Sequence, residues 1–436
     1  MKYEDVRGKG FSRRIKLPEA IKACLDSMTG FPAEEINLRD MNTAITKRIL
    51  REDIFARRTI PPFDRSAMDG YAVIAEDTVG ASEGNPLILK VTGEVQIGQV
   101  PQVRVESGTA IKITTGAMIP EGANAVIMVE DTAKLAESNE EIEIYASVHP
   151  GKHIARAGED VEKETIILKS GRRLKSVDRG FLLSAGVTRV KMSTVPSIAI
   201  FSTGNELVNA WETELEPGKI PDVNSVNLYE LCMEEGWNPR MMGIVPDEEE
   251  VLRETILQAS SNNDIILFSG GTSVGQKDLI PALFNELGKL VFHGIAMRPG
   301  GPVSAATIYE KIFFGLPGFP TATLISFHFV VRPVLLSLLG MERKSSVLTV
   351  PVRITRNVGS KLGRLDFLRI KIEKAASGEL LAVPIQIGSS GIMRSMVAGN
   401  GIIPIPESSE GLKEGDVVEA IIVGVDQAFS DFVEEK

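Results

Sequence analysis

Three segments rich in glycine and small polar residues indicate where chemistry could take place. They run over residues 202–206, 269–275 and 315–321, and each follows a short apolar run. Glycines let a ligand approach the backbone, and the exposed N–H groups and hydroxyls there suit an anion. The Gly-Lys-Ser/Thr ending of a Walker loop is missing. One such loop alone is more often structural, but three in one unit favour a ligand that carries phosphate.

Carboxylates stand beside these loops. Glu206 ends the first loop and Asp278 lies just after the second. Hard oxygen ligands near a phosphate suit Mg²⁺, which keeps several waters and takes one or two carboxylates. Asp247 has a competing interpretation, because it precedes three glutamates at a helix start and is typical of an N-cap. Asp278 has no such capping role, so a functional role is favoured there.

The cations and histidines of the sequence give weaker evidence for a functional site. Arg298 lies in a Pro-Gly-rich turn and could hold a phosphate or an oxyanion, or could be a solvated loop charge. His149 and His153 are four residues apart, but they flank a Pro-Gly turn rather than occupying a helix, so no metal pair is predicted. No Ser-His-Asp arrangement can be argued from the sequence.

The elements predicted around the glycine-rich loops form an α/β unit. Buried strands are predicted for residues 197–201, 264–268 and 312–315, and helices for about 225–235, from 247 onward, and 323–340. Alternating strands and helices imply a parallel sheet that is covered on both faces. Ligands of such sheets bind beyond the carboxyl ends of the strands, where the three loops lie.

Helical and β-rich stretches surround this unit. Helices are predicted over residues 17–28 and about 39–56, and short strands between turn residues predict a small barrel or sandwich over about 70–146. Strands at 350–354, 367–372 and 417–423 predict a second small β domain. We therefore divide the chain into an N-terminal helical segment (1–60, completed by about 147–194), a β-rich domain (61–146), the α/β domain (195–340) and a C-terminal barrel (341–436).

Composition excludes several classes of protein. The 436 residues carry a net charge of −10, which argues against nucleic acid as a main partner. Two cysteines 208 positions apart form neither a disulfide framework nor a zinc pattern, so a cytoplasmic location is expected. The N-terminus lacks the apolar stretch of a signal peptide. Charged and polar residues interrupt the apolar run at 323–340, which predicts a buried helix rather than a membrane span.

The most specific string in the sequence runs from Pro61 to Val73. By itself it could be a linker followed by an Asp-Gly turn. Taken whole, it closely resembles the signature of the molybdopterin molybdenumtransferase family, to which the C-terminal domain of gephyrin belongs. Further segments are similar to family motifs and occur in family order, at residues 113–117, 157–160, 202–206, 269–278 and 315–318. The resemblance extends from about Leu17 to the end of the chain.

This resemblance implies a fold and an activity. The expected architecture is an α/β/α parallel-sheet molybdopterin-binding domain flanked by two small β-barrel-like domains and an elongated N-terminal segment. Family members are homodimers whose cleft lies between the α/β domain of one subunit and the signature-bearing domain of the other. They insert molybdate into adenylylated molybdopterin with Mg²⁺ and release AMP. The resemblance also suggests a molybdopterin adenylyltransferase as a partner.

The resemblance assigns roles to individual residues as well. Asp69, Glu206 and Asp278 match catalytic acids of the cleft, and Asp247 and Asp278 are the expected Mg²⁺ ligands. Substrate-binding positions implied by the family are Ser66, Thr115, Asp160, Thr203, Gly204, Ser269, Gly270, Gly271, Thr272, Ser273, Gly275, Arg298, Pro299 and Pro302.

Three departures from the family pattern concern the oxyanion. Phe319 replaces an asparagine that could cap the next helix, Gly301 replaces a lysine, and Ala155 replaces an arginine and leaves only Arg156. The last two changes remove positive charge. Metal insertion is the favoured function. The alternatives are a molybdopterin-binding carrier or regulator that inserts no metal, a tungstate-inserting variant, and a nucleotide-processing phosphohydrolase that uses Asp278 and Mg²⁺.

Overall fold

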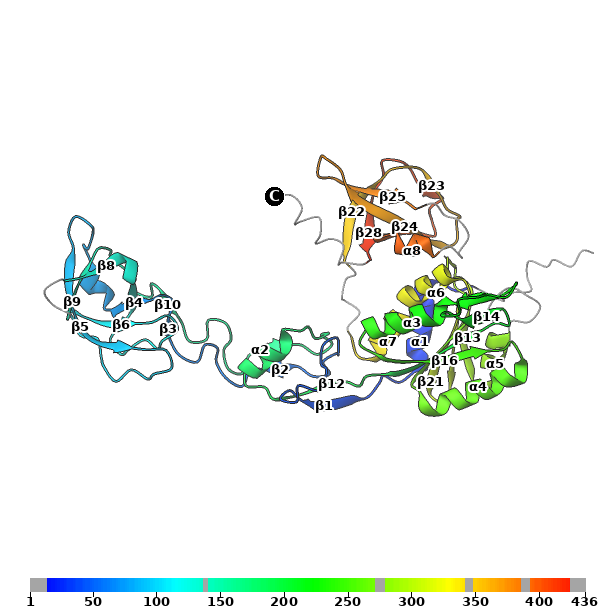
Figure 1. The fold of residues 1–436 in the computed structure, drawn as a ribbon, viewed down its shortest axis with the longest axis horizontal. Coiled ribbons are helices and arrows are strands. Elements are labelled where there is room, and N and C mark those ends of the chain that lie inside the picture. The colour runs from blue at the N-terminus through cyan, green and yellow to red at the C-terminus, as the bar shows by residue number, and fades with distance from the viewer. Residues whose placement is uncertain (1–13, 136–139, 271–278, 342–347, 386–392, 424–436) are drawn as a thin grey trace, which may run out of the picture.

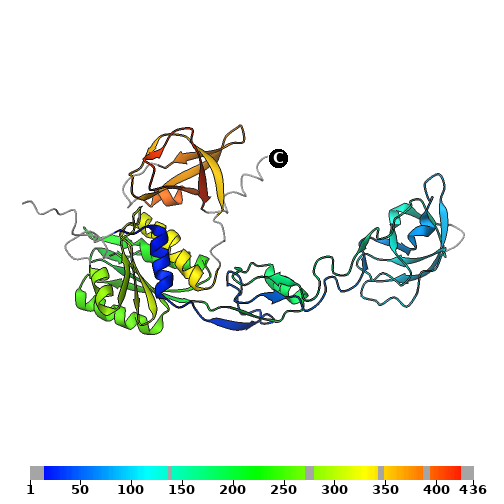
Figure 2. The ribbon, with the colours of Figure 1, turned by 180° about the vertical axis from the view of Figure 1, so that it is seen from behind.

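The computed structural model describes residues 14–135, 140–270, 279–341, 348–385 and 393–423. The molecule is elongated (Figure 1), with a small β domain at one end, an arm in the middle and the α/β unit at the other end. The C-terminal β domain lies beside the α/β unit. Figure 2 shows the same arrangement from behind. The domain boundaries drawn from the sequence stay predictions.

The α/β unit is built on a six-stranded sheet. Its order is β16 (Asn238–Val245), β13 (Ser197–Thr203), β17 (Ile265–Ser269), β21 (Lys311–Leu316), β20 (Ser304–Ile308) and β18 (Lys289–His293). The first four strands are parallel, as predicted, whereas β20 runs antiparallel to both of its neighbours, β21 and β18. Only Tyr309 and Glu310, both with positive φ, connect β20 to β21. A two-residue connection can join only antiparallel strands, so the sheet is mixed.

Helices cover both faces of this sheet. One face packs on α4 (Glu249–Asn262) and α5 (Leu279–Leu287). The other packs on α3 (Val223–Glu234), on α1 (Leu17–Ser27) and on α6 (Pro320–Ser326), which continues through a π-helical turn into α7 (Arg332–Leu338). The last stretch, Pro320–Leu338, is long and apolar enough to cross a membrane, but most of it is buried in this core. The core accounts for its apolar composition.

The arm is a two-layered piece formed by the outgoing and returning chain. β1 (Ala33–Asn37) pairs with β12 (Arg189–Ser193), and β2 (Ile54–Phe55) pairs with β11 (Ile166–Leu168), while α2 (Asp178–Ser184) covers them. The helix predicted over residues 39–56 is therefore wrong. Its apolar residues are buried against residues 168–192, and Lys47 has a φ of 70°, which an α-helix does not allow.

The β domain at the far end of the arm confirms the predicted small β fold. Its sheet has the order β7 (Ala125–Met128), β4 (Gly70–Val73), β6 (Thr109–Ile113), β5 (Leu87–Val95), β9 (Glu141–Ile144) and β8 (Thr132–Lys134). β3 (Arg65–Ser66) pairs with β10 (Ile154–Ala155) at its base. A Cβ at Gly70 would lie 1.8 Å from the Ile127 carbonyl oxygen, so β4 and β7 can approach only with glycine there.

The C-terminal β domain is a closed barrel. β24 (Leu365–Lys374), β25 (Leu380–Pro384), β22 (Thr349–Ile354), β28 (Val417–Ile422) and β26 (Gly401–Ile405) pair in sequence, and β26 returns to β24. The short helix α8 (Arg394–Val397) was not predicted. β19 (Met297–Arg298) leaves the α/β unit and pairs with β24, and Phe329 stacks on Phe367 with ring centroids 4.0 Å apart. These contacts join the barrel to the α/β unit.

Candidate functional site

The first glycine-rich loop leaves β13 and turns back on itself. Thr203 is buried at the end of the strand, and Gly204 and Glu206 follow. A Cβ at Gly204 would lie 2.7 Å from Oε2 of Glu206, at a φ of 152°. The positive φ favours glycine here, and a larger side chain would displace the Glu206 carboxylate from the loop. The side chain of Glu206 itself is exposed to solvent.

Asp247 lies beside this loop and does not cap the helix that follows. The N-cap of α4 is Glu248, so the N-cap interpretation of Asp247 is wrong. The backbone N–H of Asp247 instead donates to Oδ1 of Asn205 at 3.3 Å. Partial burial, and then the negative charge of Glu206, raise the pKa of the Asp247 carboxyl. Two carboxylates that repel one another at a solvent-accessible loop form a donor set suited to a divalent cation.

Asn224, in the first turn of α3, connects the other two loops. Its Nδ2 donates to Oγ of Ser269 at 2.8 Å and to the carbonyl oxygen of Gly318 at 2.8 Å. Ser269 ends β17, and Gly318 lies in the loop after β21. Two of the three loops are thus tied together at the carboxyl edge of the sheet. Sequence reasoning missed Asn224, although an amide in the first turn of a helix that follows a parallel strand was a usable signal.

The first and second loops also meet directly. Gly270 has a φ of 106°, and a Cβ there would lie 2.1 Å from the carbonyl oxygen of Thr203. Within the described ranges, Oγ of Ser202 and Oδ1 of Asn224 are buried without a hydrogen-bond partner. Buried polar atoms that lack partners are costly, so they mark a place where a ligand or water completes the bonding.

Several predicted site residues lie outside the described residues. They are Gly271, Thr272, Ser273, Gly275 and Asp278. Among the residues that are described, no cluster of three or more His, Cys, Asp or Glu side chains could hold a metal. Glu206 and Asp247 form a pair only, so the predicted Mg²⁺ role of Asp247 and Asp278 stays a prediction.

The signature string forms a second cluster, in the far β domain. The backbone N–H of Thr115 donates to Oδ1 of Asp69 at 2.7 Å, and the N–H of Gly116 donates to the carbonyl oxygen of Ser66 at 2.8 Å. Ser66 is buried, whereas Asp69 and Thr115 are exposed. Asp160 is exposed too and lies at the junction with the arm, where its N–H donates to the carbonyl oxygen of Ile60.

Arg156 cannot serve as a free cation. Its NH1 lies 2.6 Å from Oδ2 of Asp64, and the N–H of Ala157 donates to the other oxygen at 2.8 Å. The Ala157 hydrogen bond, followed by Arg156, lowers the pKa of the Asp64 carboxyl. The charge of Arg156 is therefore neutralised within the signature segment, and it does not replace the arginine missing at Ala155.

A different pair of arginines gathers near the predicted oxyanion turn. A small cavity between the α/β unit and the C-terminal barrel is lined by Arg298, Pro299 and Arg369, among others, and by Asp366, whose carboxylate is paired with Arg364. Arg369 is buried, and its guanidinium donates to the Phe367 carbonyl oxygen and to Oγ of Ser395. Burial, with a smaller contribution from the charge of Arg298, lowers the pKa of Arg369. Two nearby cations next to a cavity suit an anion.

One of the departures from the family pattern, Gly301, has a local structural explanation. A Cβ at Gly301 would lie 2.9 Å from the carbonyl oxygen of Met297, so no lysine fits there without a backbone shift. Pro302 follows in the same turn. Phe319 is exposed at the N-terminus of α6 and makes no side-chain capping bond. Sequence reasoning missed Arg369, whose signal was a cation inside the apolar run Phe367–Ile370.

The two clusters do not meet within one chain. Figures 1 and 2 place β3 and β4, which carry Ser66 and lead from Asp69, at the opposite end of the molecule from β13 and α4. The structure thus brings Thr203, Gly204, Glu206, Asp247, Ser269 and Gly270 together at one edge of the sheet. It leaves Ser66, Asp69, Thr115 and Asp160 at the other end of the arm.

Fold and site together define a multidomain protein whose central α/β unit presents polar loops at the carboxyl edge of its sheet. Three family models match consecutive parts of the chain: the MoeA N-terminal region (domain I and II) over 15–186, a probable molybdopterin binding domain over 199–337 and the MoeA C-terminal region (domain IV) over 351–423. The chain belongs to the MoeA family of molybdopterin molybdenumtransferases.

Individual relatives support this assignment over nearly the whole chain. A putative molybdopterin biosynthesis protein of Methanocaldococcus jannaschii is 36% identical, covering 94% of this chain and 98% of that protein. The molybdopterin molybdenumtransferase of Bacillus subtilis is 32% identical, covering 86% and 87%. The crystal structure of a molybdopterin biosynthesis MoeA protein from Pyrococcus horikoshii superimposes with a TM-score of 0.74 at 38% identity, covering 94% and 99%. The predicted family and fold are confirmed.

Asn224 offers a direct test of the ligand edge. Asn224→Ala removes both bonds that tie Ser269 to Gly318, so we expect a loss of about 1–3 kcal/mol in unfolding free energy. Molybdopterin should also bind about tenfold more weakly. Denaturant unfolding and calorimetric titration measure these effects. Asn227→Ala, one turn along the same helix, is the control, because the Asn227 amide makes a weak 3.7 Å contact to Sδ of Met393. Equal behaviour of the two variants would contradict the role of Asn224.

Proposed function

We propose that this protein inserts molybdate into adenylylated molybdopterin and releases AMP, as a molybdopterin molybdenumtransferase of molybdenum cofactor biosynthesis. The observation that carries the proposal is the carboxyl edge of the α/β sheet, where Asn224 joins two loops and buried oxygens lack partners. Family membership over the whole chain supports it. The substrate implies an adenylyl-transferring enzyme that supplies it, which is the partner we propose.

The α/β edge is suited to the phosphates of the substrate. The buried hydroxyl of Ser202 offers a donor to phosphate oxygens. A donor held in a buried position needs little reorganisation to bind a phosphate oxygen. The roles of the individual loop residues, those of residues 271–278 included, stay predictions.

Mg²⁺ fits the acidic side of this edge. Glu206 and Asp247 would hold it together with Asp278, because their mutual repulsion, which raises the pKa of Asp247, is relieved by a cation. When bound, Mg²⁺ neutralises charge on the phosphates. Glu206 is exposed and lies against Gly204, and in that position its carboxylate can accept a proton from the substrate or return one to it.

The molybdate substrate is a dianion, and we place it near Arg298 and Arg369. Their cavity lies between the α/β unit and the C-terminal barrel. Arg369 supplies the charge that the family turn loses at Gly301, which supports insertion over a carrier that handles no oxyanion. Tungstate has nearly the same size and charge, so the same pair would hold it.

A second copy of the chain completes the cleft in this proposal. Asp69 and Thr115 are exposed at the far end of the arm, away from the loops of their own chain. Closed two-fold dimers are the commonest assembly, and each copy would supply its far β domain to the other. Both cysteines are free and buried, which supports the cytoplasm as the location.

The activity is tested by AMP release from adenylylated molybdopterin with Mg²⁺, with and without molybdate or tungstate. We expect release that depends on the oxyanion and that falls by about 100-fold or more in Asp278→Ala. Glu254→Ala, an exposed acid on α4, serves as the control. Tight pterin binding without release would favour the carrier, and release from nucleotides that lack the pterin would favour the phosphohydrolase.

Oxyanion binding is tested at the two arginines. Arg369→Met should raise the KM for molybdate about tenfold or more, because a charge-assisted hydrogen bond is lost. Arg298→Met, at an exposed position, should act in the same direction. Arg353→Met is the control, since Arg353 pairs with Glu379 elsewhere on the same barrel. A KM in Arg369→Met and Arg298→Met that matches the control would remove the oxyanion from this cavity.

The shared cleft is tested by mixing inactive subunits. Asp69→Ala and Asp247→Ala lie in different halves of the proposed cleft, so a mixed dimer has one cleft with both changes and one with neither. Random reassociation should restore about a quarter of wild-type activity. Each variant alone is the control, and sedimentation checks that dimers form. Mixtures no more active than their components would show that each chain works by itself.

A further inference from the structure

The arm is attached to the α/β unit by only two chain segments. They are residues 28–32, which lead out to β1, and residues 194–196, which return from β12. Two strands of chain by themselves allow bending, so the contacts around the joint determine how the arm is held. These contacts lie far from the glycine-rich loops and are not explained by ligand binding.

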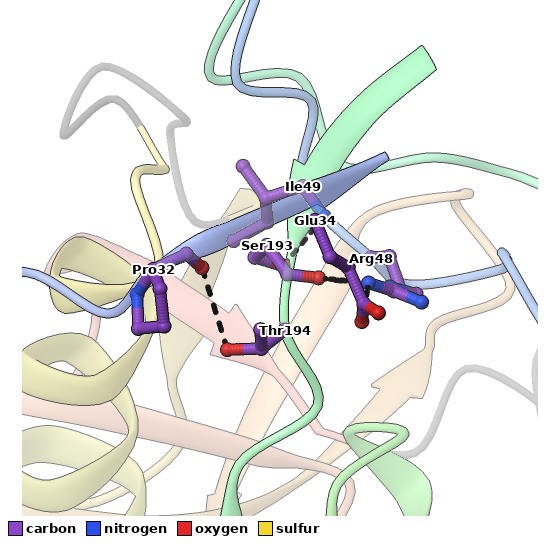
Figure 3. A network of polar contacts seen from close by, with 6 residues as sticks. All are labelled: Pro32, Glu34, Arg48, Ile49, Ser193 and Thr194. Atoms are coloured by element: carbon purple, nitrogen blue, oxygen red, sulfur yellow. Dashed lines mark hydrogen bonds and ion pairs between the residues drawn. The ribbon is translucent and has the colours of Figure 1, made fainter. Parts of the chain in front are cut away.

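Arg48 fixes the base of the arm, as Figure 3 shows. This buried arginine donates through Nε to the carbonyl oxygen of Ser193 at 2.9 Å, and its NH2 lies 2.5 Å from Oε1 of Glu34. Thr194 Oγ1 donates to the Pro32 carbonyl oxygen at 3.4 Å. The outgoing and returning segments are therefore locked to one another. This lock makes the base of the arm stiff, but it does not set the angle between the arm and the α/β unit.

Two side chains of the arm reach the α/β unit and hold this angle: Arg51, whose NH1 donates to the Leu339 carbonyl oxygen at 3.0 Å, and Arg173. NH2 of Arg173 lies 2.8 Å from Oε2 of Glu235 and donates to the Glu235 carbonyl oxygen at 2.9 Å. The other carboxylate oxygen, Oε1, lies 2.7 Å from Nε of Arg332 on α7. The side chain of Glu235 is 13% exposed and that of Arg173 is 20% exposed. One largely buried carboxylate thus joins a cation of the arm to a cation of the sheet's covering helix.

The position of Glu235 strengthens this contact. It directly follows α3, so its carbonyl oxygen belongs to the unsatisfied end of the helix, where a cation is favourable. Nε of Arg173 also donates to the carbonyl oxygen of Lys47 at 3.1 Å, which ties two arm segments into the same contact. A Cβ at Gly236 would lie 3.3 Å from Cβ of Lys47, so the arm sits directly against this helix end.

We propose that Arg173, Glu235 and Arg332 form a latch, and that they are positioning residues for the shared reaction. The far β domain lies at the other end of the arm (Figure 1), so a small rotation at the latch displaces Asp69 by a larger distance. Within the part of the chain that the structure describes, the hydrogen bonds and ion pairs of the latch involve none of the glycine-rich loops. The latch acts by holding the far β domain in the position that the cleft of the partner chain requires. This role in the reaction rests on the proposed function.

The arm's orientation is measured first, by a method that needs no activity. Lys163→Cys on the arm and Gln258→Cys on α4 are exposed positions for nitroxide labels, and both native cysteines are buried. Labelled chains are diluted into unlabelled chains, so that pulsed electron paramagnetic resonance reports the distance between the two labels within one subunit. The variants compared in this background are Arg173→Met, Arg173→Lys and, as the control, Arg189→Met. Arg189 forms an exposed pair with Glu35 within the arm, away from the joint.

We expect Arg173→Met to broaden the distance distribution and Arg173→Lys, which keeps the charge, to restore most of it. Without the labels, Arg173→Met should lower kcat by about 10- to 100-fold with the KM for the pterin substrate unchanged. A distribution no broader than that of Arg189→Met would overturn the latch. Broadening with an unchanged kcat would overturn its role in the reaction. A wild-type protein without oxyanion-dependent AMP release would overturn the proposed function, while the distances would still decide whether the latch exists.

Discussion

The antiparallel pairing of β1 with β12 is the constraint on which the shape of the molecule depends. Ala33 faces Ser193 and Asn37 faces Arg189, so residues about 150 positions apart are held in register. The intervening chain has to leave the α/β unit and come back along the same path. It forms the arm and the far β domain in between, and the signature residues are carried away from the ligand loops of their own chain.

The ligand edge shows how backbone contacts decide side-chain choice. Gly270 is required because a Cβ there would collide with the backbone oxygen of Thr203, whereas a Cβ at Gly204 would displace the flexible Glu206 carboxylate. Close packing of the first loop against the start of the second leaves little space for side chains at Gly270.

A feature could be predicted from the sequence when it depends on neighbouring residues, and could not when it depends on residues far away in the chain. The strands of the α/β unit were predictable, because each is a continuous apolar run buried on both faces. The stretch 39–56 was not, because its apolar spacing fits a helix while its partners lie beyond residue 165. Family motifs located the loops. They did not reveal Asn224 or Arg369, whose roles arise only when distant elements come together.

The charged groups of the site were likewise only partly predictable from the sequence, because some come from distant elements. The missing family cations suggested a weakened oxyanion site, and Arg156 looked like a replacement. The structure pairs Arg156 with Asp64 and instead places Arg369, from the C-terminal barrel, at the cavity with Arg298. A charge lost from one turn can be supplied from another domain, since an anion responds to the field at its position and not to the segment that provides it.

Helix α3 connects the glycine-rich loops to the arm. Asn224, in its first turn, ties the ligand loops together, and Glu235, directly after its last residue, holds Arg173 of the arm. Its 12 residues span about 18 Å. A helix buried against the sheet along one side does not bend easily, because its backbone hydrogen bonds and its packing would both be lost. The glycine-rich loops and the arm therefore both contact one rigid helix. This helix keeps the loops and the arm of a chain in a fixed position relative to one another.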